Sequence, residues 1–457
     1  MVTLHPHQSQ GVNYIVSQFL TKKLKAFLLS DGTGLGKTFT ASCALMRIQQ
    51  LMGDPNAKIL VVCPLSVIPH WIKSFKELDP TFDRFEVINY NRLKKLFTIT
   101  TSPEGDTAVY NREEFKYIIF DESHMLKNYS SVSYKLSLPI IEGAAFTLFL
   151  SATPAQSPLE VAYLQPILGF TNYFSWLKRT GFAVGKHPTR QHITWNPNPL
   201  DIDHIYNQIF PKGMGLQRKP SDIAGWPEQQ IEQMPLQLTS AEMKIYDAAF
   251  KDYLKARAKA GGKPLNEDTE QMVKASVLRY KISQIKVPHT VTFVKDLLQQ
   301  GNCKVAIFCE FLKTIETIKE SLDPGTALVL TGETSPEDRE RIMHEFRYGP
   351  AQVIIFNIHQ SINLEQPSKD HPKRYQVNHD IPWSGIKAIQ ANGRCHRNGM
   401  HCIIYNVYGM GTIDERIVAR MSDRCRYIAK LAGDVTGGAT LAQPEFDFFE
   451  SIIDESP

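Results

Sequence analysis

A glycine-rich segment at residues 31–38 directly follows the apolar run 26–29 and ends in Lys37 and Thr38. A short buried strand, a glycine-rich turn and a helix that begins at a lysine form a cradle for phosphate groups. The glycines let backbone N–H groups approach phosphate oxygens, and the helix N-terminus adds positive potential. Lys37 would reach the β- and γ-phosphates, and the Thr38 hydroxyl would ligate Mg²⁺. The pattern predicts an α/β fold with a nucleotide site, and its plainest alternative is an ordinary strand-to-helix turn.

This segment departs from the general phosphate-loop pattern at its first position. Asp31 stands where that pattern has a glycine, whereas Gly34 and Gly36 supply the backbone freedom that close approach to phosphate requires. We therefore expect Gly34, Gly36, Lys37 and Thr38 to bind ATP, with Thr38 also a magnesium ligand.

A second apolar run, residues 117–120, ends in Asp121 and Glu122. The carboxyl ends of strands in a parallel sheet face the ligand crevice, so both carboxylates would lie near the phosphate cradle. Asp121 would hold Mg²⁺ through water, and Glu122 would orient or deprotonate the attacking water. Taken alone, the pair is also compatible with a solvated acidic turn.

A third segment, residues 390–399, carries Arg394 and Arg397 more than 350 positions after the cradle. Arginines three positions apart share one face of a helix or turn. A guanidinium suits the charge that develops on a transferring phosphoryl group, and such an arginine contributes about 10³–10⁵ in rate. Alone, the segment is typical of a basic helix end, but its distance along the chain predicts a second domain that delivers the arginines across a cleft.

These three segments, in this order, resemble those of superfamily 2 helicases and translocases, and more closely those of the Swi/Snf-type ATPases. Two features are typical of that branch: Asp31 in the cradle, and Lys127 with Asn128 after the acidic pair. Residues 4–12 resemble the family element that reads adenine, with Gln8 as the base reader.

Further segments resemble the coupling and nucleic-acid motifs of the same family. Residues 150–154 resemble the motif that couples hydrolysis to DNA, and residues 217–222 resemble the arginine–lysine segment that crosses between lobes. Residues 380–383 correspond to a motif with aspartate and tryptophan. The positions that the resemblance implies as DNA contacts are Pro64, Ser66, His70, Trp71, Thr331, Gly332 and Asn363.

The resemblance implies two RecA-like parallel-sheet lobes with helical insertions and ATP in the cleft between the lobes. The residues implied to bind the nucleotide are Gln8, Gly34, Gly36, Lys37, Thr38, Asp121 and Gln390. Thr38 and, through water, Asp121 would hold Mg²⁺. The residues implied to act in catalysis are Lys37, Glu122, Arg394 and Arg397. Ser361 replaces a glycine of the family pattern, and Ser384 with Gly385 replaces an Asn-Pro pair, but no catalytic side chain is lost.

The alternation of strand-like and helical segments predicts three regions. Residues 1–167 form an ATP-binding lobe, residues 168–290 form helical protrusions and the lobe linker, and residues 291–457 form the second lobe with a C-terminal brace helix. Residues 98–106, rich in threonine, serine, proline and glycine, are expected to form a surface loop. The basic stretch 251–263 would either meet DNA or form a solvated helix face.

Bulk properties agree with a protein that works inside a cell. The net charge of +4 neither requires nor excludes nucleic acid. Seven scattered cysteines without a Cys-x-x-Cys pair argue against a structural zinc site and favour a reducing compartment. No apolar run reaches the roughly 18 residues of a membrane span, and no signal peptide opens the sequence. We expect a cytoplasmic enzyme, or a phage-encoded one that acts in the host cytoplasm.

The function expected is that of an ATP-driven translocase or helicase acting on branched DNA, by fork unwinding or Holliday junction branch migration, in recombination, repair or replication. Its partners would be duplex, forked or four-way DNA and no membrane, and it would act as a monomeric motor with ATP and Mg²⁺. The alternatives are a duplex-DNA translocase that remodels protein–DNA complexes, an RNA-dependent ATPase, and a nucleotide-switched binding module with weak turnover.

Overall fold

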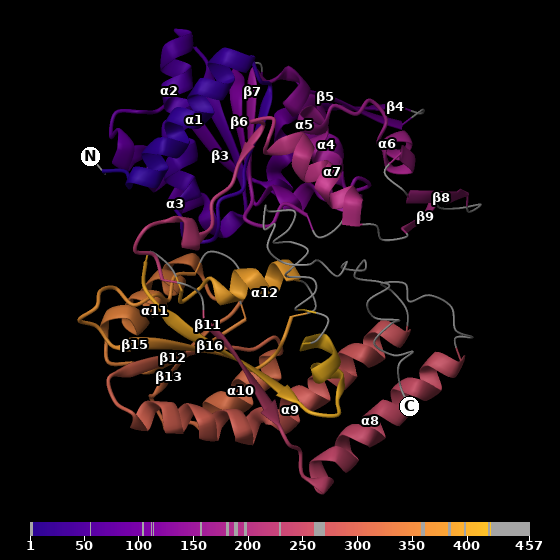
Figure 1. Ribbon diagram of the computed structural model, residues 1–457, viewed down its shortest axis with the longest axis vertical. Coiled ribbons are helices and arrows are strands. Elements are labelled where there is room, and N and C mark those ends of the chain that lie inside the picture. Colours follow the sequence, from indigo (N-terminus) through magenta and orange to yellow (C-terminus); the bar gives the residue numbers. More distant parts are fainter. Residues whose placement is uncertain are drawn as a thin grey trace. The chain divides into compact units, whose positions relative to one another are not determined.

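The computed structural model describes residues 3–54, 56–102, 105–110, 112, 114–155, 158–179, 182–186, 191–195, 199–227, 230–259, 270–357, 362–382, 385–396, 399–418 and 421. These residues form two compact units, and the division between them falls after Ile223. Each unit is built on a parallel β-sheet covered by helices (Figure 1). The chain is therefore an α/β protein with two sheet lobes, as the motifs predict.

The first unit contains, within the described residues, a six-stranded parallel sheet in the order β10-β1-β7-β6-β2-β3. Its strands are β1 Ala26–Leu29, β2 Lys58–Cys63, β3 Phe85–Asn89, β6 Phe115–Asp121, β7 Phe146–Leu150 and β10 Gly215–Leu216. Its helices are α1 Pro6–Lys22, α2 Lys37–Met52, α3 Ile68–Leu78, α4 Val132–Gly143, α5 Gln165–Leu168, α6 Tyr173–Arg179 and α7 Pro199–Ile209. Parallel neighbours need crossover connections, which is why strands and helices alternate in the sequence.

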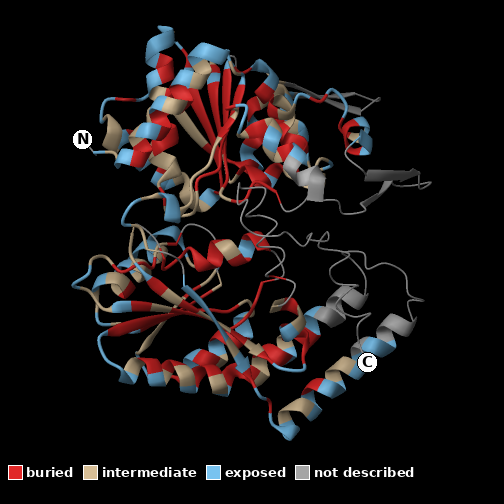
Figure 2. Cartoon of the chain, in the orientation of Figure 1, coloured by how far each residue is buried: buried red, intermediate tan, exposed pale blue. Residues whose placement is uncertain are grey.

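The strands of this sheet form the centre of the first unit. All residues of β1 and β7 are buried, and Figure 2 shows the sheet as a buried layer beside helices with exposed outer faces. Strands of a parallel sheet that is covered on both sides are buried on both faces, and they are therefore continuous apolar runs. The helices complete the core, α2 through Ala41, Leu45 and Ile48, and α3 through Trp71 and Phe75.

The order of the strands brings three sequence motifs to one edge of the sheet. Strands β1, β7 and β6 are consecutive neighbours and run parallel. Strand β1 leads into residues 31–38, β6 ends at Asp121, and β7 leads into residues 151–154. Because parallel strands end at the same edge, the phosphate cradle, the acidic pair and the coupling motif follow neighbouring strand ends.

The second unit contains, in the part of it that the structure describes, a six-stranded parallel sheet in the order β11-β16-β15-β12-β14-β13. Its strands are β11 Gln230–Leu236, β12 Cys303–Phe308, β13 Ala327–Leu330, β14 Val353–Phe356, β15 Lys373–Asn378 and β16 Cys402–Gly409. Its helices are α8 Ser240–Lys259, α9 Glu270–Gln299, α10 Leu312–Ser321, α11 Pro336–Tyr348 and α12 Gly385–Asn392.

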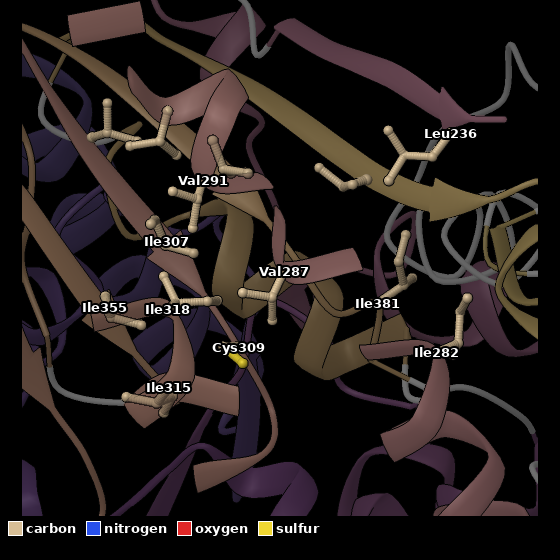
Figure 3. Close-up of a cluster of buried hydrophobic side chains, with 14 of the residues drawn as sticks. Leu236, Ile282, Val287, Val291, Ile307, Cys309, Ile315, Ile318, Ile355 and Ile381 are labelled. Atoms are coloured by element: carbon tan, nitrogen blue, oxygen red, sulfur yellow. The ribbon is translucent and has the colours of Figure 1, made fainter. Parts of the chain in front are cut away.

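Helix α9 is part of the core of the second unit. Its residues Val287 and Val291 belong to one cluster of buried side chains with Ile315 and Ile318 of α10 and Ile307 of β12 (Figure 3). Apolar side chains on two helices thus cover one face of the sheet, and their removal from water stabilises the unit.

A buried charge also fixes α9 to this sheet. Lys286 has no exposed surface, and its Nζ lies 2.6 Å from a carboxylate oxygen of Asp414. The same ammonium donates hydrogen bonds to the backbone carbonyls of His379, at 2.5 Å, and Val407, at 3.1 Å. A buried ammonium needs such a full set of acceptors, so α9 is bound to β16 and to the segments that follow β15 and β16.

The stretch predicted to be helical protrusions and linker, residues 168–290, is divided between the two units. Strand β10 adds to the first sheet and β11 to the second, and an antiparallel hairpin, β8 Phe182–Lys186 with β9 Gln191–Trp195, lies in the first unit. Strand β10 has two residues, and most residues of β11 are exposed at a sheet edge. Neither strand carries the apolar run that identifies a strand in a sequence.

Residues 98–106 differ from the surface loop that the sequence predicts. They fall mostly within an antiparallel hairpin formed by β4 Phe97–Ser102 and β5 Gly105–Tyr110. Threonine is favoured in strands, and Ser102 and Gly105, two of the residue types that suggested a loop, form the last pair of the described ladder. Among the described helices, none combines the length and apolar character needed to cross a membrane.

Candidate nucleotide site and nucleic-acid contact segments

The phosphate cradle joins β1 to α2, and its glycines hold conformations that other residues rarely adopt. Gly34 and Gly36 have φ angles of 84° and 76°, in the left-handed region. Gly36 is also the residue that caps the N-terminus of α2. A Cβ at Gly36 would clash with the side-chain amide nitrogen of Gln8, so both the backbone conformation and the available space require glycine there.

Gln8, the residue expected to read adenine, lies against the cradle. Its Nε2 donates to the carbonyl of Leu35 at 3.4 Å, and its Oε1 accepts from the backbone N–H of His5 at 2.9 Å. The ring Nε2 of His7 also lies 3.0 Å from the Leu35 carbonyl. The N-terminal helix and the phosphate cradle are therefore one local structure.

Lys37 folds back over the cradle. Its ammonium donates to the carbonyl oxygens of Asp31 and Gly32, at 2.7 Å and 3.2 Å. Charged phosphate oxygens are stronger acceptors than peptide carbonyls. The arrangement therefore fits a lysine that exchanges these two carbonyls for the phosphates of a bound nucleotide.

Asp31, the departure from the general phosphate-loop pattern, is explained by Arg218. The Asp31 side chain has no exposed surface, and both of its oxygens bind the Arg218 guanidinium, Oδ1 at 3.0 Å from Nε and Oδ2 from Nη2. Arg218 also donates to the backbone carbonyl of His7, and its own carbonyl accepts from Gly32 N–H at 2.9 Å. One buried ion pair thus ties together the N-terminal helix, the cradle and the segment after β10. Sequence reasoning assigned Arg218 to a lobe-crossing segment and did not pair it with Asp31.

Asp121 is held at the end of β6 by two donors. Its Oδ2 accepts from the indole N–H of Trp71 at 2.8 Å, and its Oδ1 accepts from the Glu122 backbone N–H at 3.0 Å. Desolvation and the neighbouring Glu122 carboxylate raise the pKa of Asp121 to about 7. A divalent cation would relieve the repulsion between two such close carboxylates.

Glu122 connects the acidic pair to the coupling motif. It adopts φ 49°, an uncommon conformation for a residue with a side chain, and its carboxylate lies 3.3 Å from Nδ1 of His124. The same ring nitrogen lies 3.1 Å from Oγ of Ser151, which in turn accepts from the Thr153 backbone N–H at 3.1 Å. Burial, together with the charge of Lys127, lowers the pKa of His124 to about 4, so this ring is neutral near pH 7.

The residues near the cradle fit ATP and Mg²⁺. Thr38 and Asp121 offer hydroxyl and carboxylate oxygens, the ligands that Mg²⁺ prefers. The left-handed glycines, the lysine and the helix N-terminus offer the donors that phosphates require. The first unit therefore supplies donors for the phosphates and oxygen ligands for the cation.

The first predicted DNA-contact segment presents its residues unequally. His70 is exposed, Ser66 is half-buried and Pro64 is buried. The Trp71 side chain, also a predicted DNA contact, has no exposed surface. Trp71 and Phe75 are four positions apart on α3 and both pack in the core, while His70 lies on the outer face.

The DNA contacts predicted for the second unit lie after β13 and β14. Thr331 is half-buried and Gly332 is exposed, and the Gly332 N–H donates to the Asn357 side chain at 3.2 Å. Arg339 donates to the Gly332 carbonyl at 3.0 Å, which holds the turn in place. Asn363 is half-buried, and its amide donates to the Glu365 carboxylate at 2.9 Å.

Arg394 and Gln390 are both buried in the second unit. Arg394 is 6% exposed, and its guanidinium donates to the carbonyls of Gln390, at 2.5 Å, and Ile362, at 3.4 Å. Gln390, a predicted nucleotide contact, is 3% exposed. Arg397 and Ser361 lie outside the described residues.

A second group of potential ligands in this unit is a hydrogen-bonded cluster. Cys309, His379 and Asp380 bring side-chain atoms within 4.8 Å of one another. Both ring nitrogens of His379 already have partners, the Ser283 carbonyl at 2.9 Å and the Thr290 hydroxyl at 2.8 Å. Burial lowers the pKa of His379 to about 4. The neutral ring therefore serves to fix the end of β15 and has no free nitrogen for a metal.

Together, a phosphate cradle, an acidic pair at the same edge of the sheet and a second parallel-sheet unit define a two-lobe nucleoside triphosphatase of the helicase class. Two family profiles match the chain in the same order. The profile described as SNF2-related domain matches residues 7–287, and that described as helicase conserved C-terminal domain matches residues 289–399. The chain belongs to the SNF2-related family and is a DNA-dependent ATPase of the helicase class. The family, the fold class and the enzyme class predicted from the motifs are thereby confirmed.

Curated relatives are similar along most of this chain. "Uncharacterized ATP-dependent helicase YqhH" of Bacillus subtilis is 24% identical over 94% of this chain and 80% of its own length. The Xenopus laevis "SWI/SNF-related matrix-associated actin-dependent regulator of chromatin subfamily A-like protein 1" is 23% identical over 93% of this chain. The mouse "DNA annealing helicase and endonuclease ZRANB3" is 22% identical over 95% of it. The chain spans less than half of these two vertebrate relatives, 44% and 41% of their lengths.

Among solved structures, a Sulfolobus solfataricus SWI2/SNF2 ATPase core in complex with dsDNA is 17% identical, with a TM-score of 0.39, over 95% of this chain and 94% of that one. The family assignment above comes from the profile matches.

Replacing Arg218 by methionine tests the buried ion pair. The change leaves the Asp31 carboxylate buried without its partner, so we expect the free energy of unfolding of the first unit to fall by about 3–5 kcal/mol. Adding Asp31→Asn should restore part of that loss, because a neutral amide costs less to bury. Urea unfolding of the four proteins in this double-mutant cycle measures both effects.

The matched control is Arg112→Met. Arg112 pairs with Glu114 at 2.7 Å, but its side chain is 33% exposed, and an exposed pair of this kind contributes under about 1 kcal/mol. Equal losses for the Arg218 and Arg112 variants would contradict a structural role for the Asp31–Arg218 pair.

Proposed function

We propose that the protein is an ATP-driven DNA translocase that acts on branched DNA, by unwinding forks or moving the branch point of four-way junctions. The ATP-driven part is supported by one observation above all, the placement of the cradle and the acidic pair at one edge of the sheet, after the parallel strands β1 and β6 that flank β7. The branched-DNA part is supported by the relative named as a DNA annealing helicase. Moving a branch point exchanges paired arms without changing the number of base pairs, so a small ATP-driven bias is sufficient.

In this proposal the first unit holds ATP and Mg²⁺. Backbone N–H groups around Gly34 and Gly36 and the ammonium of Lys37 bind the phosphates, and Thr38 and Asp121 hold the cation. Glu122 accepts the proton of, or orients, the attacking water. The neutral His124 lies 3.3 Å from the Glu122 carboxylate. It keeps the carboxylate in place, and because the ring is uncharged it does not offset the negative charge that a base needs.

Substitution of Lys37 and Glu122 separates binding from turnover. We expect Lys37→Ala to weaken binding of a fluorescent ATP analogue and to lower DNA-stimulated ATPase activity at least about a hundredfold, because it removes the ammonium group that binds the phosphates. Glu122→Gln should lower turnover by a similar factor and keep nucleotide binding, because it removes only the water-activating carboxylate. Lys116→Ala, which removes a surface lysine paired with Asp54 at 2.8 Å, is the control for charge. Near-normal turnover in Glu122→Gln would refute the role given to the acidic pair.

The two arginines should divide their roles. We propose that Arg397 meets the charge that develops on the transferring phosphoryl group, and that Arg394 supports the same segment through its bonds to Gln390 and Ile362. Arg397→Ala should then lower the maximal DNA-stimulated rate by about 10³ with ATP affinity kept. Arg394→Ala should lower the melting temperature of the protein, because it removes a buried guanidinium and leaves two carbonyls without their donor. An unchanged maximal rate in Arg397→Ala would exclude it as the phosphoryl contact.

A second candidate is a duplex-DNA translocase that remodels protein–DNA complexes. The observation that favours it is similarity to the yeast "TATA-binding protein-associated factor MOT1", which is 22% identical over 91% of this chain. This candidate needs the same ATP site but predicts a different DNA substrate.

Strand release from labelled DNA distinguishes the candidates. We expect ATP-dependent release from a four-way junction and from a fork, weak activity on a long blunt duplex, and none with Glu122→Gln. Binding should weaken steeply with salt, because phosphate contacts dominate it. Displacement of a bound protein from linear duplex without action on junctions would favour the remodelling candidate, and stimulation by RNA alone would favour an RNA-dependent ATPase.

A further inference from the structure

Helix α3 has two faces with different environments. His70, Ile72 and Lys73 are exposed on one side, and Trp71 and Phe75 are buried on the other. The helix directly follows the short turn after β2, and β2 is the neighbour of β6 in the sheet. His70, the predicted DNA contact on the exposed face, and the strand that carries Asp121 therefore lie on opposite sides of this helix.

Trp71 bridges this distance with a single hydrogen bond. Its indole N–H donates to Oδ2 of Asp121 at 2.8 Å, while the other oxygen of that carboxylate accepts from the Glu122 backbone. The hydroxyl of Tyr90 donates to the Asp121 carbonyl at 2.7 Å. The aspartate is thus oriented by side-chain donors from two other segments, and of these two donors Trp71 is the one that binds the carboxylate itself.

The position of Trp71 is itself fixed. Its ring has no exposed surface and lies 6.2 Å, centroid to centroid, from that of Phe75. The Ser74 hydroxyl donates to the Trp71 carbonyl at 2.8 Å and lies 3.1 Å from the hydroxyl of Ser42 on α2, the helix that begins at Lys37. A shift of α3 would therefore move the indole donor, and the carboxylate that it holds, relative to the cradle.

We propose that Trp71 is a positioning residue that connects the outer face of α3 to the magnesium-holding carboxylate of Asp121. The inference rests on the proposed function, because it takes Asp121 as a magnesium ligand and α3 as a DNA contact. Indole is a donor only, so the bond leaves the remaining lone pairs of the carboxylate for the hydration shell of a cation. DNA bound on α3 then favours the carboxylate orientation that binds Mg²⁺ with ATP. The competing interpretation is that Trp71 only fills the core.

Trp71→Phe separates these interpretations, since it keeps an aromatic ring and removes the N–H. The affinity for a fluorescent ATP analogue is measured by anisotropy with Mg²⁺ and with EDTA. We expect about tenfold weaker binding with Mg²⁺ and unchanged binding with EDTA, the loss of a hydrogen bond to a charged group. The stimulation of the ATPase by DNA should also fall, and saturating Mg²⁺ should restore part of the basal rate.

Trp176→Phe is the matched control. Trp176 is also buried in the first unit, at 6% exposed, and its ring packs against Phe170 at 5.2 Å and Tyr173 at 6.2 Å. Both variants lose a similar amount of aromatic volume, so an effect on Mg²⁺-dependent binding that is specific to Trp71→Phe identifies the N–H. The proposal would be overturned if Trp71→Phe and Trp176→Phe bound the analogue equally well with Mg²⁺. It would also be overturned if Trp71→Phe lost as much affinity with EDTA as with Mg²⁺.

An NMR measurement follows the indole N–H directly in the unsubstituted protein. With ¹⁵N-labelled tryptophan, the indole N–H signals of the five tryptophans are recorded, and the Trp71 signal is the one absent from Trp71→Phe. We expect this signal to shift on addition of ADP with Mg²⁺ and again with duplex DNA, and not with ADP and EDTA. No response of this signal, in a protein whose ATPase is stimulated by DNA, refutes the inference alone. Absence of DNA stimulation in the unsubstituted protein refutes the proposed function instead.

Discussion

Parallel strands that neighbour one another end at the same edge of their sheet, and the site of this protein depends on that constraint. Strands β1, β7 and β6 are consecutive, so the segments that follow them have to share one edge although they are up to about 120 positions apart in sequence. Backbone groups at strand ends are no longer paired within the ladder and are available to ligands. The cradle, the acidic pair and the coupling motif use this edge, and the apolar strands behind them provide rigid support.

Around this edge, partners for buried or crowded charges hold the loops in place. Asp31 is fully buried and needs the Arg218 guanidinium, and Asp121 shares its surroundings with Glu122 and accepts the Trp71 N–H. A carboxylate without such partners would cost several kcal/mol in these positions. Each partner comes from a segment far away in the sequence. The loops of the nucleotide site are thus fixed by contacts with α1, α3 and the segment after β10. Movement of any of these segments would therefore shift the loops.

Sequence patterns succeeded where local chemistry is strict. The glycines of the cradle, the apolar runs of β1 and β7 and the acidic pair at the end of β6 are recognisable because each position tolerates few residue types. The patterns failed where a contact depends on distant segments. The motif that contains Trp71 does not reveal that its side chain packs in the core beside Phe75 and donates to Asp121. Strand β11 was missed because an exposed edge strand does not need apolar residues.

The sequence by itself determined the two-lobe α/β class, the SNF2-related family and the positions of the glycine-rich cradle and the acidic pair, because these follow from periodicity and from short-range stereochemistry. The tertiary structure decided which residues complete the site. It paired Asp31 with Arg218 and Asp121 with Trp71, and it placed α9 in the core of the second unit through Lys286. A buried charge selects its partner by position in space, and position in space depends on the order of the strands, which no local pattern in the sequence encodes.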